Sequence, residues 1–298
     1  YLHHAFFSVG SGSCDARRQE KVALVMGVAN QKSIAWACVQ TFLTKGYHVI
    51  ITHQERYNDK VQSLVSSHTD GRSAIKAQIL GHLKCDVQKD LPLLFSEQIP
   101  HILSNTGNDA DSDLSIDVIV HCIAYGNLQV SLKEANWDTF SQAQHVSAFS
   151  FLETAQCAVQ APGILSSTGV SLTALSYLGA SRALYPYHVM GPAKASLEAL
   201  VRGMALEFGR EVETNVRLGH PQFRVNAISA GPIATLSARG GIEDFRTLQR
   251  TVSQNSPLGR SVRAEEVAQT IAWVSESSAI TGQTIYVDGG YSSIVPTI

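Results

Sequence analysis

KVALVMGVANQKSIAWA, residues 21–37, joins an apolar run to a short turn and then to an amphipathic segment. The apolar run predicts a buried strand, and the segment after Ser33 predicts a helix, as in the strand-turn-helix of dinucleotide-binding domains. The usual fingerprint of that turn is G-x-G-x-x-G, but only Gly27 is present here. Ser33 stands at the expected helix start, where its hydroxyl can cap backbone N–H groups or bind a pyrophosphate oxygen. The stretch alone does not decide between a cofactor site and an ordinary turn.

The rest of the chain alternates short β-branched runs with longer amphipathic segments, which is the pattern of βαβ units. We therefore expect an α/β fold: a single doubly wound, Rossmann-like domain over residues 21–298, with a seven-stranded parallel sheet and helices on both faces. The expected strands are residues 21–28, 48–54, 82–87, 117–124, 170–178, 223–230 and 284–290. The expected helices are residues 33–45, 138–161, 188–209 and 264–276.

Three stretches fall outside this pattern. Residues 1–20 are expected to form a disordered or processed tail, in which Arg17, Arg18 and several serines are also compatible with the remnant of an organelle transit peptide. The polar runs 104–115 and 212–221 are expected to be surface loops.

The composition excludes several classes of function. Of the 298 residues, 44% are hydrophobic, which is enough for a sizeable core. A net charge of −2 with interspersed signs gives no basic stripe for nucleic acid and no polybasic segment for a membrane surface. No segment approaches the ~20 apolar residues that span a bilayer. The five cysteines are scattered without metal-ligand spacing, so we expect reduced thiols and no metal site.

Distinctive motifs follow the ends of the expected strands, where ligands bind in open parallel sheets. CDV (85–87) ends the third strand and HCIAYG (121–126) the fourth. SYLGASRALYPYHVMGPAKASLEALVR (176–202) follows, and RVNAISAGPIAT (224–235) ends the sixth. With these motifs the chain resembles the bacterial-type enoyl-acyl-carrier-protein reductases of the short-chain dehydrogenase/reductase superfamily, from about Lys21 to Gly290. The resemblance implies reduction of trans-2-enoyl thioesters by NADH, the last step of the type II fatty acid elongation cycle.

The resemblance also implies roles for individual residues. That family uses G-x-x-x-x-x-S-I-A in place of three glycines, so the opening motif is complete in Gly27, Ser33 and Ile34. The further implied cofactor contacts are Gln54, Asp86, Val87, Ile123, Lys194, Ile233 and Thr235. The implied substrate residues are Gly126, Tyr177 and Tyr187, and residues 234–255 match the mobile segment that covers the substrate. For Val87, Ile123 and Ile233, plain core packing is the alternative interpretation.

The sequence also departs from the family pattern. Ala37 and Ala124 stand where many relatives have glycine, and Ser181 and Pro192 replace commoner residues. None of these changes removes an expected reacting group.

Tyr187 and Lys194 are the expected catalytic residues, with Tyr177 as a second tyrosine that flanks the acyl chain. Their Y-x6-K spacing would place the first two on one face of a helix, about 10 Å apart along its axis. Hydride addition to the β carbon of an enoyl thioester creates an enolate, which needs a positioned donor. Tyr187 is the candidate donor, while Lys194 would bind the nicotinamide ribose and add positive charge. The alternative is a helix-start aromatic residue and a solvated lysine without a catalytic role.

Two other functions stay open at this point. A 3-oxoacyl or other carbonyl reductase of the same superfamily would want Y-x3-K and a serine about thirteen residues before the tyrosine, and no tyrosine has that spacing to Lys194. A non-catalytic dinucleotide-binding sensor would have no need of Tyr187 and Lys194.

The cofactor and partners follow from the same motifs. We expect NADH in preference to NADPH, because Gln54 and Glu55 would stand where a 2′-phosphate must sit, unless Arg56 turns inward to compensate. The resemblance implies an acyl-carrier protein as partner and a homotetramer formed through residues 138–161 and 188–209. Phe149, Phe151, Leu197, Leu200 and Met204 are the apolar residues expected to supply that contact. We expect the enzyme to act in the cytoplasm or, alternatively, in a plastid or other organelle matrix.

Overall fold

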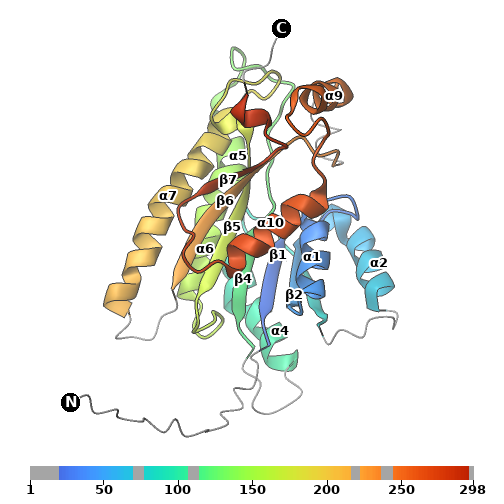
Figure 1. The fold of residues 1–298 in the computed structure, drawn as a ribbon. Coiled ribbons are helices and arrows are strands. Elements are labelled where there is room, and N and C mark those ends of the chain that lie inside the picture. The colour runs from blue at the N-terminus through green and yellow to red at the C-terminus, as the bar shows by residue number, and fades with distance from the viewer. Residues whose placement is uncertain (1–19, 70–76, 107–113, 216–221, 236–243, 295–298) are drawn as a thin grey trace, which may run out of the picture.

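The computed structural model describes residues 20–69, 77–106, 114–215, 222–235 and 244–294. Within these ranges the chain forms one parallel sheet of seven strands between two layers of helices (Figure 1), so the expected α/β fold is confirmed. The strands lie in the order β3-β2-β1-β4-β5-β6-β7. The chain adds β2 and β3 on one side of β1 and β4 to β7 on the other, so the order of strand addition reverses between β1 and β4. They are β1 (Val22–Met26), β2 (His48–His53), β3 (Ile79–Lys84), β4 (Ile116–His121), β5 (Val170–Tyr177), β6 (Phe223–Ala230) and β7 (Thr284–Val287).

Helices cover both faces of this sheet. One layer holds α1, α2 and α10, and the opposite layer holds α4, α6 and α7. A π-helical turn at His145–Phe149 joins α5 directly to α6. The helices are α1 (Ile34–Thr44), α2 (Asn58–Thr69), α3 (Leu91–Leu93), α4 (Ile99–Thr106), α5 (Trp137–Gln144), α6 (Ser150–Gln160), α7 (Met190–Asn215), α9 (Phe245–Asn255) and α10 (Ala264–Glu276).

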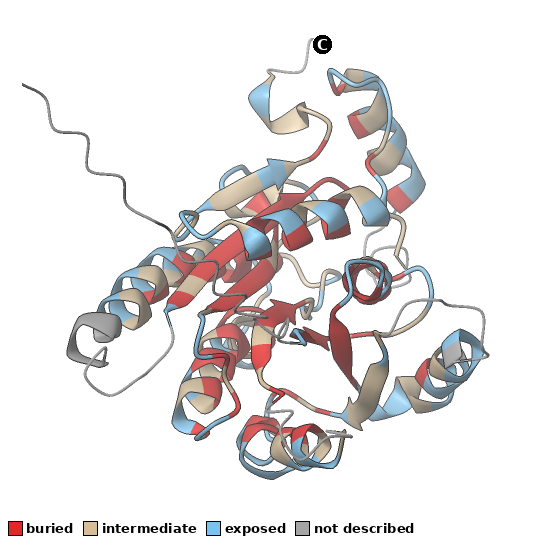
Figure 2. Cartoon of the chain, turned by 60° about the horizontal axis from the view of Figure 1, so that its bottom comes forward, coloured by how far each residue is buried: buried red, intermediate tan, exposed pale blue. Residues whose placement is uncertain are grey.

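Every residue of the strand β1 is apolar because both faces of the strand are buried. Val22, Leu24 and Met26 face the layer of α6 and α7, whereas Ala23 and Val25 face the layer of α1 and α10. All five are fully buried, because successive strand residues point to opposite faces and both faces are covered. Figure 2 shows the central strands buried in this way, whereas the edge strands β3 and β7 are only partly buried and the helices are exposed on their outer sides.

The helix α1 begins and ends at residues that the sequence specifies. Ser33 caps it, since its Oγ accepts a hydrogen bond from Trp36 N–H at 3.1 Å. At the other end Gly46 adopts φ +88°, and the N–H groups of Gly46 and Tyr47 donate to Leu43 O and Phe42 O. This Schellman ending returns the chain into β2 and brings the rings of Phe42 and Tyr47 to 5.2 Å.

Several predicted boundaries differ from the structure. The third strand occupies 79–84 instead of 82–87, because its ladder with β2 runs from Ile79 to Lys84 and the CDV motif follows it. The two predicted loops begin inside helices, since 104–106 belong to α4 and 212–215 to α7. The helices α2, α3 and α4 were not predicted. No helix within the described ranges is long and apolar enough to cross a membrane.

Parts of the remaining predictions lie outside the described residues. These parts are residues 1–19 of the tail, 107–113 and 216–221 of the polar runs, and 236–243 of the substrate-covering segment. The described remainder of that segment consists mainly of α9.

Candidate active site

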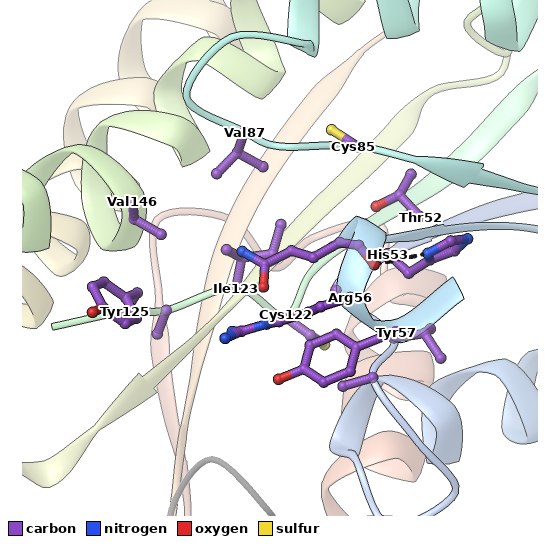
Figure 3. Close-up of a pocket in the computed structure, with 15 residues that line it drawn as sticks. Thr52, His53, Arg56, Tyr57, Cys85, Val87, Cys122, Ile123, Tyr125 and Val146 are labelled. Atoms are coloured by element: carbon purple, nitrogen blue, oxygen red, sulfur yellow. Dashed lines mark hydrogen bonds between the residues drawn. The ribbon is translucent and has the colours of Figure 1, made fainter. Parts of the chain in front are cut away.

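A long cleft lies at the carboxyl ends of the strands, around the point where the sheet order reverses. It consists of three adjoining cavities that share the side chains of Arg56 and Tyr125. The central cavity, about 90 Å³, is lined from the ends of β1, β2 and β4 (Figure 3). The polar cavity, about 560 Å³, lies toward β3 and includes Lys84 and Asp86. The tyrosine cavity, about 510 Å³, lies toward β5 and β6, so the cleft runs along the carboxyl ends of the strands from β3 to β6.

The structure brings all but one of the predicted site residues to this cleft. The central cavity is lined by Gly27, Gln54, Val87 and Ile123. The polar cavity adds Asp86. The tyrosine cavity is lined by Ile34, Gly126, Tyr177, Tyr187, Lys194, Ile233 and Thr235. Ser33 is not among the lining residues of these cavities.

Gly27 and Ser33 both have structural reasons for their identity. Gly27 has φ +89°, and a Cβ there would lie 2.5 Å from the backbone oxygen of Cys122 on the neighbouring strand's end. The Ser33 hydroxyl donates to Asn30 O at 2.8 Å while it accepts from Trp36 N–H. The turn is therefore fixed by packing against β4 and by the helix cap, even before any ligand is considered.

Tyr187 does not lie on the helix that carries Lys194, so the predicted shared helical face is wrong. The helix α7 begins at Met190, and Tyr187 belongs to the turn before it. His188 adopts φ +31°, which interrupts helical geometry, and Met190 N–H donates to Tyr187 O at 2.9 Å. The turn nevertheless brings both side chains to the tyrosine cavity.

The two tyrosines of this cavity contact each other edge to face. The ring centroids of Tyr177 and Tyr187 are 5.0 Å apart at an interplanar angle of 60°. Burial, and to a smaller extent Tyr291, raises the pKa of Tyr177 to about 12. Burial and then Tyr177 raise the pKa of Tyr187 well above its ordinary value. Both phenols are therefore protonated at neutral pH and able to donate a hydrogen bond.

Gly179 is a site residue that the sequence did not reveal. A Cβ at this position would lie 2.3 Å from Cδ1 of the Tyr187 ring, so only glycine leaves room for that ring. Its φ is not in the left-handed region, and the requirement comes from space alone. The SYLGA motif contains this glycine, but nothing in the sequence indicates which side chain it faces.

Lys194 is buried, which rules out the interpretation of a solvated surface lysine. The residue is only 3% exposed, and its Nζ donates a hydrogen bond of 2.7 Å to Leu175 O near the end of β5. Burial lowers the pKa of Lys194 to about 8, although Cys122 and Glu198 act in the opposite direction. Two further N–H groups of the ammonium are left for a ligand, since Lys carries three.

His121 is another buried polar group beside this site. Its Nε2 lies 2.9 Å from Ser150 Oγ, and within the described residues its Nδ1 has no hydrogen-bond partner. Burial, with a contribution from the Lys194 charge, lowers the pKa of His121 to about 3. The imidazole is therefore neutral and does not add a second cation next to Lys194.

The loop after β2 changes the basis of the predicted cofactor preference. Glu55 points largely to solvent and forms an ion pair with Lys84 at 2.8 Å, so its negative charge is partly compensated. Arg56 is an exposed residue whose side chain lines the rim of all three cavities, with its guanidinium 4.8 Å from the centroid of the Tyr57 ring. Figure 3 shows the Arg56 side chain alongside Tyr57 in the central cavity.

The loop after β4 is held in place by Ser147, which lies in the π-helical turn between α5 and α6. Tyr125 N–H donates to Ser147 Oγ, and the same hydroxyl lies 2.9 Å from Tyr125 O. At Gly126 a Cβ would lie 2.5 Å from the sulfur of Met190. A larger residue at position 126 would therefore require the Met190 side chain at the start of α7 to shift.

The cysteines carry no metal site and no disulfide in the part of the chain that the structure describes. Cys38, Cys85, Cys122 and Cys157 are free thiols, and no group of three or more potential ligands gathers among the described residues. Cys14 lies outside the described residues.

Comparison with known proteins gives a consistent result. The sequence model of a family described as "Enoyl-(Acyl carrier protein) reductase" matches residues 27–292. The enoyl-[acyl-carrier-protein] reductase [NADH] of Bacillus cereus is 36% identical over 279 residues, 92% of this chain and 97% of that protein. The corresponding protein of Nostoc is 37% identical over 278 residues, 91% of this chain and 96% of that protein.

A solved structure agrees with these sequences. The crystal structure of the Bacillus cereus enoyl-acyl carrier protein reductase with NADP⁺ and indole naphthyridinone aligns with a TM-score of 0.77 at 34% identity. The alignment covers 93% of this chain and 98% of that one. The resemblance inferred from the motifs is thereby confirmed.

Proposed function

The chain belongs to the enoyl-(acyl carrier protein) reductase family, and we propose that its cleft binds NADH along the central and polar cavities and an enoyl thioester in the tyrosine cavity. The enzyme reduces the carbon–carbon double bond of trans-2-enoyl thioesters on acyl-carrier protein, the last step of type II fatty acid elongation. The observation that carries the site assignment is the meeting of Tyr177, Tyr187 and buried Lys194 in one cavity at the end of β5.

The residues present fit the cofactor. The cleft crosses the switch point of the sheet, where dinucleotides bind in doubly wound folds. Gln54 and Asp86 at the polar end would hold the adenosine, and Ile123, Ile233 and Thr235 the nicotinamide end. Lys194 would donate its two remaining N–H groups to the ribose hydroxyls. When bound, NADH supplies the hydride for the reaction.

The catalytic roles follow from where charge develops. Addition of hydride to the β carbon moves electron density onto the thioester oxygen, and a donor aimed at that oxygen stabilises the transition state. Tyr187 is the donor in our assignment, because it lines the cavity as a half-buried side chain and its raised pKa keeps it a neutral phenol. The Lys194 ammonium adds positive charge near the same oxygen. Tyr177 packs against Tyr187 and borders the path of the acyl chain.

The assembly and the compartment are also part of the proposal. We infer a homotetramer formed through α5, α6 and α7, which fits the exposure of Phe149 at 45% and Leu206 at 52%. Phe151, Leu197 and Met204, which were expected to contribute, are instead buried within the subunit. Four free thiols in the described residues suit a reducing compartment, the cytoplasm or an organelle matrix. Light scattering that gives the monomer mass of 32.2 kDa would refute the tetramer.

The activity is tested by following NADH absorbance with crotonyl and longer trans-2-enoyl thioesters, on coenzyme A and on acyl-carrier protein. We expect turnover of these substrates and none of the corresponding 3-oxoacyl thioesters. Faster turnover of the 3-oxoacyl substrate would establish a carbonyl reductase instead. Binding of NADH without turnover of either substrate class would indicate a sensor.

A further inference from the structure

A partly buried hydrogen bond beside the tyrosine cavity has no part in the roles assigned above. Ser176 Oγ donates to Glu198 Oε1 at 2.5 Å. Ser176 is 5% exposed, lines the cavity, and immediately precedes Tyr177 at the end of β5. Glu198 lies on α7, one helical turn after Lys194.

The strand β5 and the helix α7 are therefore joined by two neighbouring hydrogen bonds. Leu175 O accepts from Lys194 Nζ at 2.7 Å, and the hydroxyl of the next residue, Ser176, donates to Glu198. Lys194 and Glu198 are four residues apart, so their side chains lie on one face of the helix, about 6 Å apart at Cβ. The pair of bonds fixes the start of α7 to the strand end that carries Tyr177.

Lys194 has few groups around it that favour its charged form. The titratable side chains that act on it are His121 at the end of β4, Cys122 directly after it, and Glu198 from its own helix. His121 is neutral, whereas Cys122 and then Glu198 favour the charged form of Lys194. Glu198 supplies a carboxylate, which opposes the loss of the Lys194 proton that burial favours.

We propose that Glu198, anchored by the Ser176 hydroxyl, is a positioning residue that keeps Lys194 as an ammonium and directs it toward the ribose of the bound cofactor. The proposal rests on the cofactor-binding role of Lys194 given above. Glu198 acts through Lys194 and does not itself line the tyrosine cavity.

The test compares Glu198→Gln with Glu207→Gln. The first change keeps an acceptor for Ser176 and the shape of the side chain but removes the charge. The second removes the same charge from an exposed position of the same helix. The dissociation constant of NADH is measured by fluorescence titration from about pH 6 to about pH 9.5, because the wild-type affinity should fall as Lys194 loses its proton near pH 8. We expect Glu198→Gln to move this fall about one pH unit lower, and Glu207→Gln to leave it unchanged.

A second pair of variants tests the anchor. Ser176→Ala leaves the charge but frees it to move, so NADH binding should weaken about two- to tenfold near pH 7, in line with the net contribution of one ordinary hydrogen bond. Ser176→Thr retains the hydroxyl and should restore wild-type affinity. Wild-type affinity in Ser176→Ala would overturn the anchoring role.

The outcomes separate this proposal from the proposed function. If Glu198→Gln and Glu207→Gln give the same pH dependence as the wild type, Glu198 does not position Lys194. If the wild type binds NADH but reduces no enoyl thioester, the proposed function fails, whereas the pH dependence of NADH binding still decides the role of Glu198.

Discussion

Replacement of Tyr187 by phenylalanine tests the assignment of the proton donor. The change removes one hydroxyl and leaves the ring, which is seated against Gly179 and Tyr177. Packing is therefore preserved, and any loss of rate reports the missing hydrogen bond. A donor aimed at the enolate oxygen acts mainly in the transition state, so kcat should fall while KM stays nearly constant.

The expected loss is one to three orders of magnitude in kcat. Removal of one donor from an oxyanion site typically costs about 10²–10³ in kcat, or about 2.7–4 kcal/mol. The lower limit allows for partial replacement, because the Tyr177 ring lies only 5.0 Å away and water can enter the space of the lost hydroxyl. A tenfold loss corresponds to about 1.4 kcal/mol of transition-state stabilisation.

The assay is the single-turnover hydride step at saturating NADH, measured by stopped-flow absorbance. Tyr177→Phe is the matched control, since it removes a hydroxyl from the neighbouring ring of the same cavity. We expect this control to change KM modestly and to keep kcat within a few-fold. If Tyr177→Phe is slower than Tyr187→Phe, the two tyrosines have been assigned the wrong roles.

Four further predictions follow from the described contacts. Lys194→Ala should raise the NADH dissociation constant, measured by fluorescence without substrate, because we assign its ammonium to the ribose of the cofactor; unchanged binding would argue against that role. The kcat/KM should be higher with NADH than with NADPH, and because Arg56 lines the cleft, Arg56→Ala should widen the difference; a clear NADPH preference in the wild type would show that the Arg56 charge dominates. Gly179→Ala should lower kcat about tenfold or more by displacing the Tyr187 ring, and full activity would show that the ring can move without consequence. Alkylation of Cys122 by iodoacetamide, followed by peptide mass spectrometry, should be slowed by saturating NADH, since the thiol lines the central cavity; equal rates would place the cofactor elsewhere.

The fold was predictable because its strands are buried on both faces. A run such as Val22 to Met26 is apolar at every position, and the sixth strand, 223–230, has the predicted bounds. The signal is weaker in α2, which was missed. Its apolar stripe is short, with Val61 fully buried and Leu64 and Val65 only partly buried against the core. The third strand is only half-buried and contains Gly81, which explains why its start was misplaced.

The candidate site was predictable where a motif names the residue. The Y-x6-K spacing identified Tyr187 and Lys194 as candidates. Their relative placement depends on the turn at His188, which helical periodicity does not predict. Gly179 and Glu198 escaped notice because their importance lies in contacts with residues distant in the sequence. Such contacts arise only when β5 and α7 have packed together.

Transfer of deuterium from NADH tests the central claim most directly. The enzyme is incubated with NADH that carries deuterium at both C4 positions and with a trans-2-enoyl thioester, and the product is analysed by mass spectrometry and NMR. We expect a saturated thioester with one deuterium at the β carbon, since in the proposed reaction hydride adds there while Tyr187 donates to the thioester oxygen. Recovery of the enoyl thioester unchanged, together with deuterium on the hydroxyl-bearing carbon when a 3-oxoacyl thioester is supplied, would contradict the account.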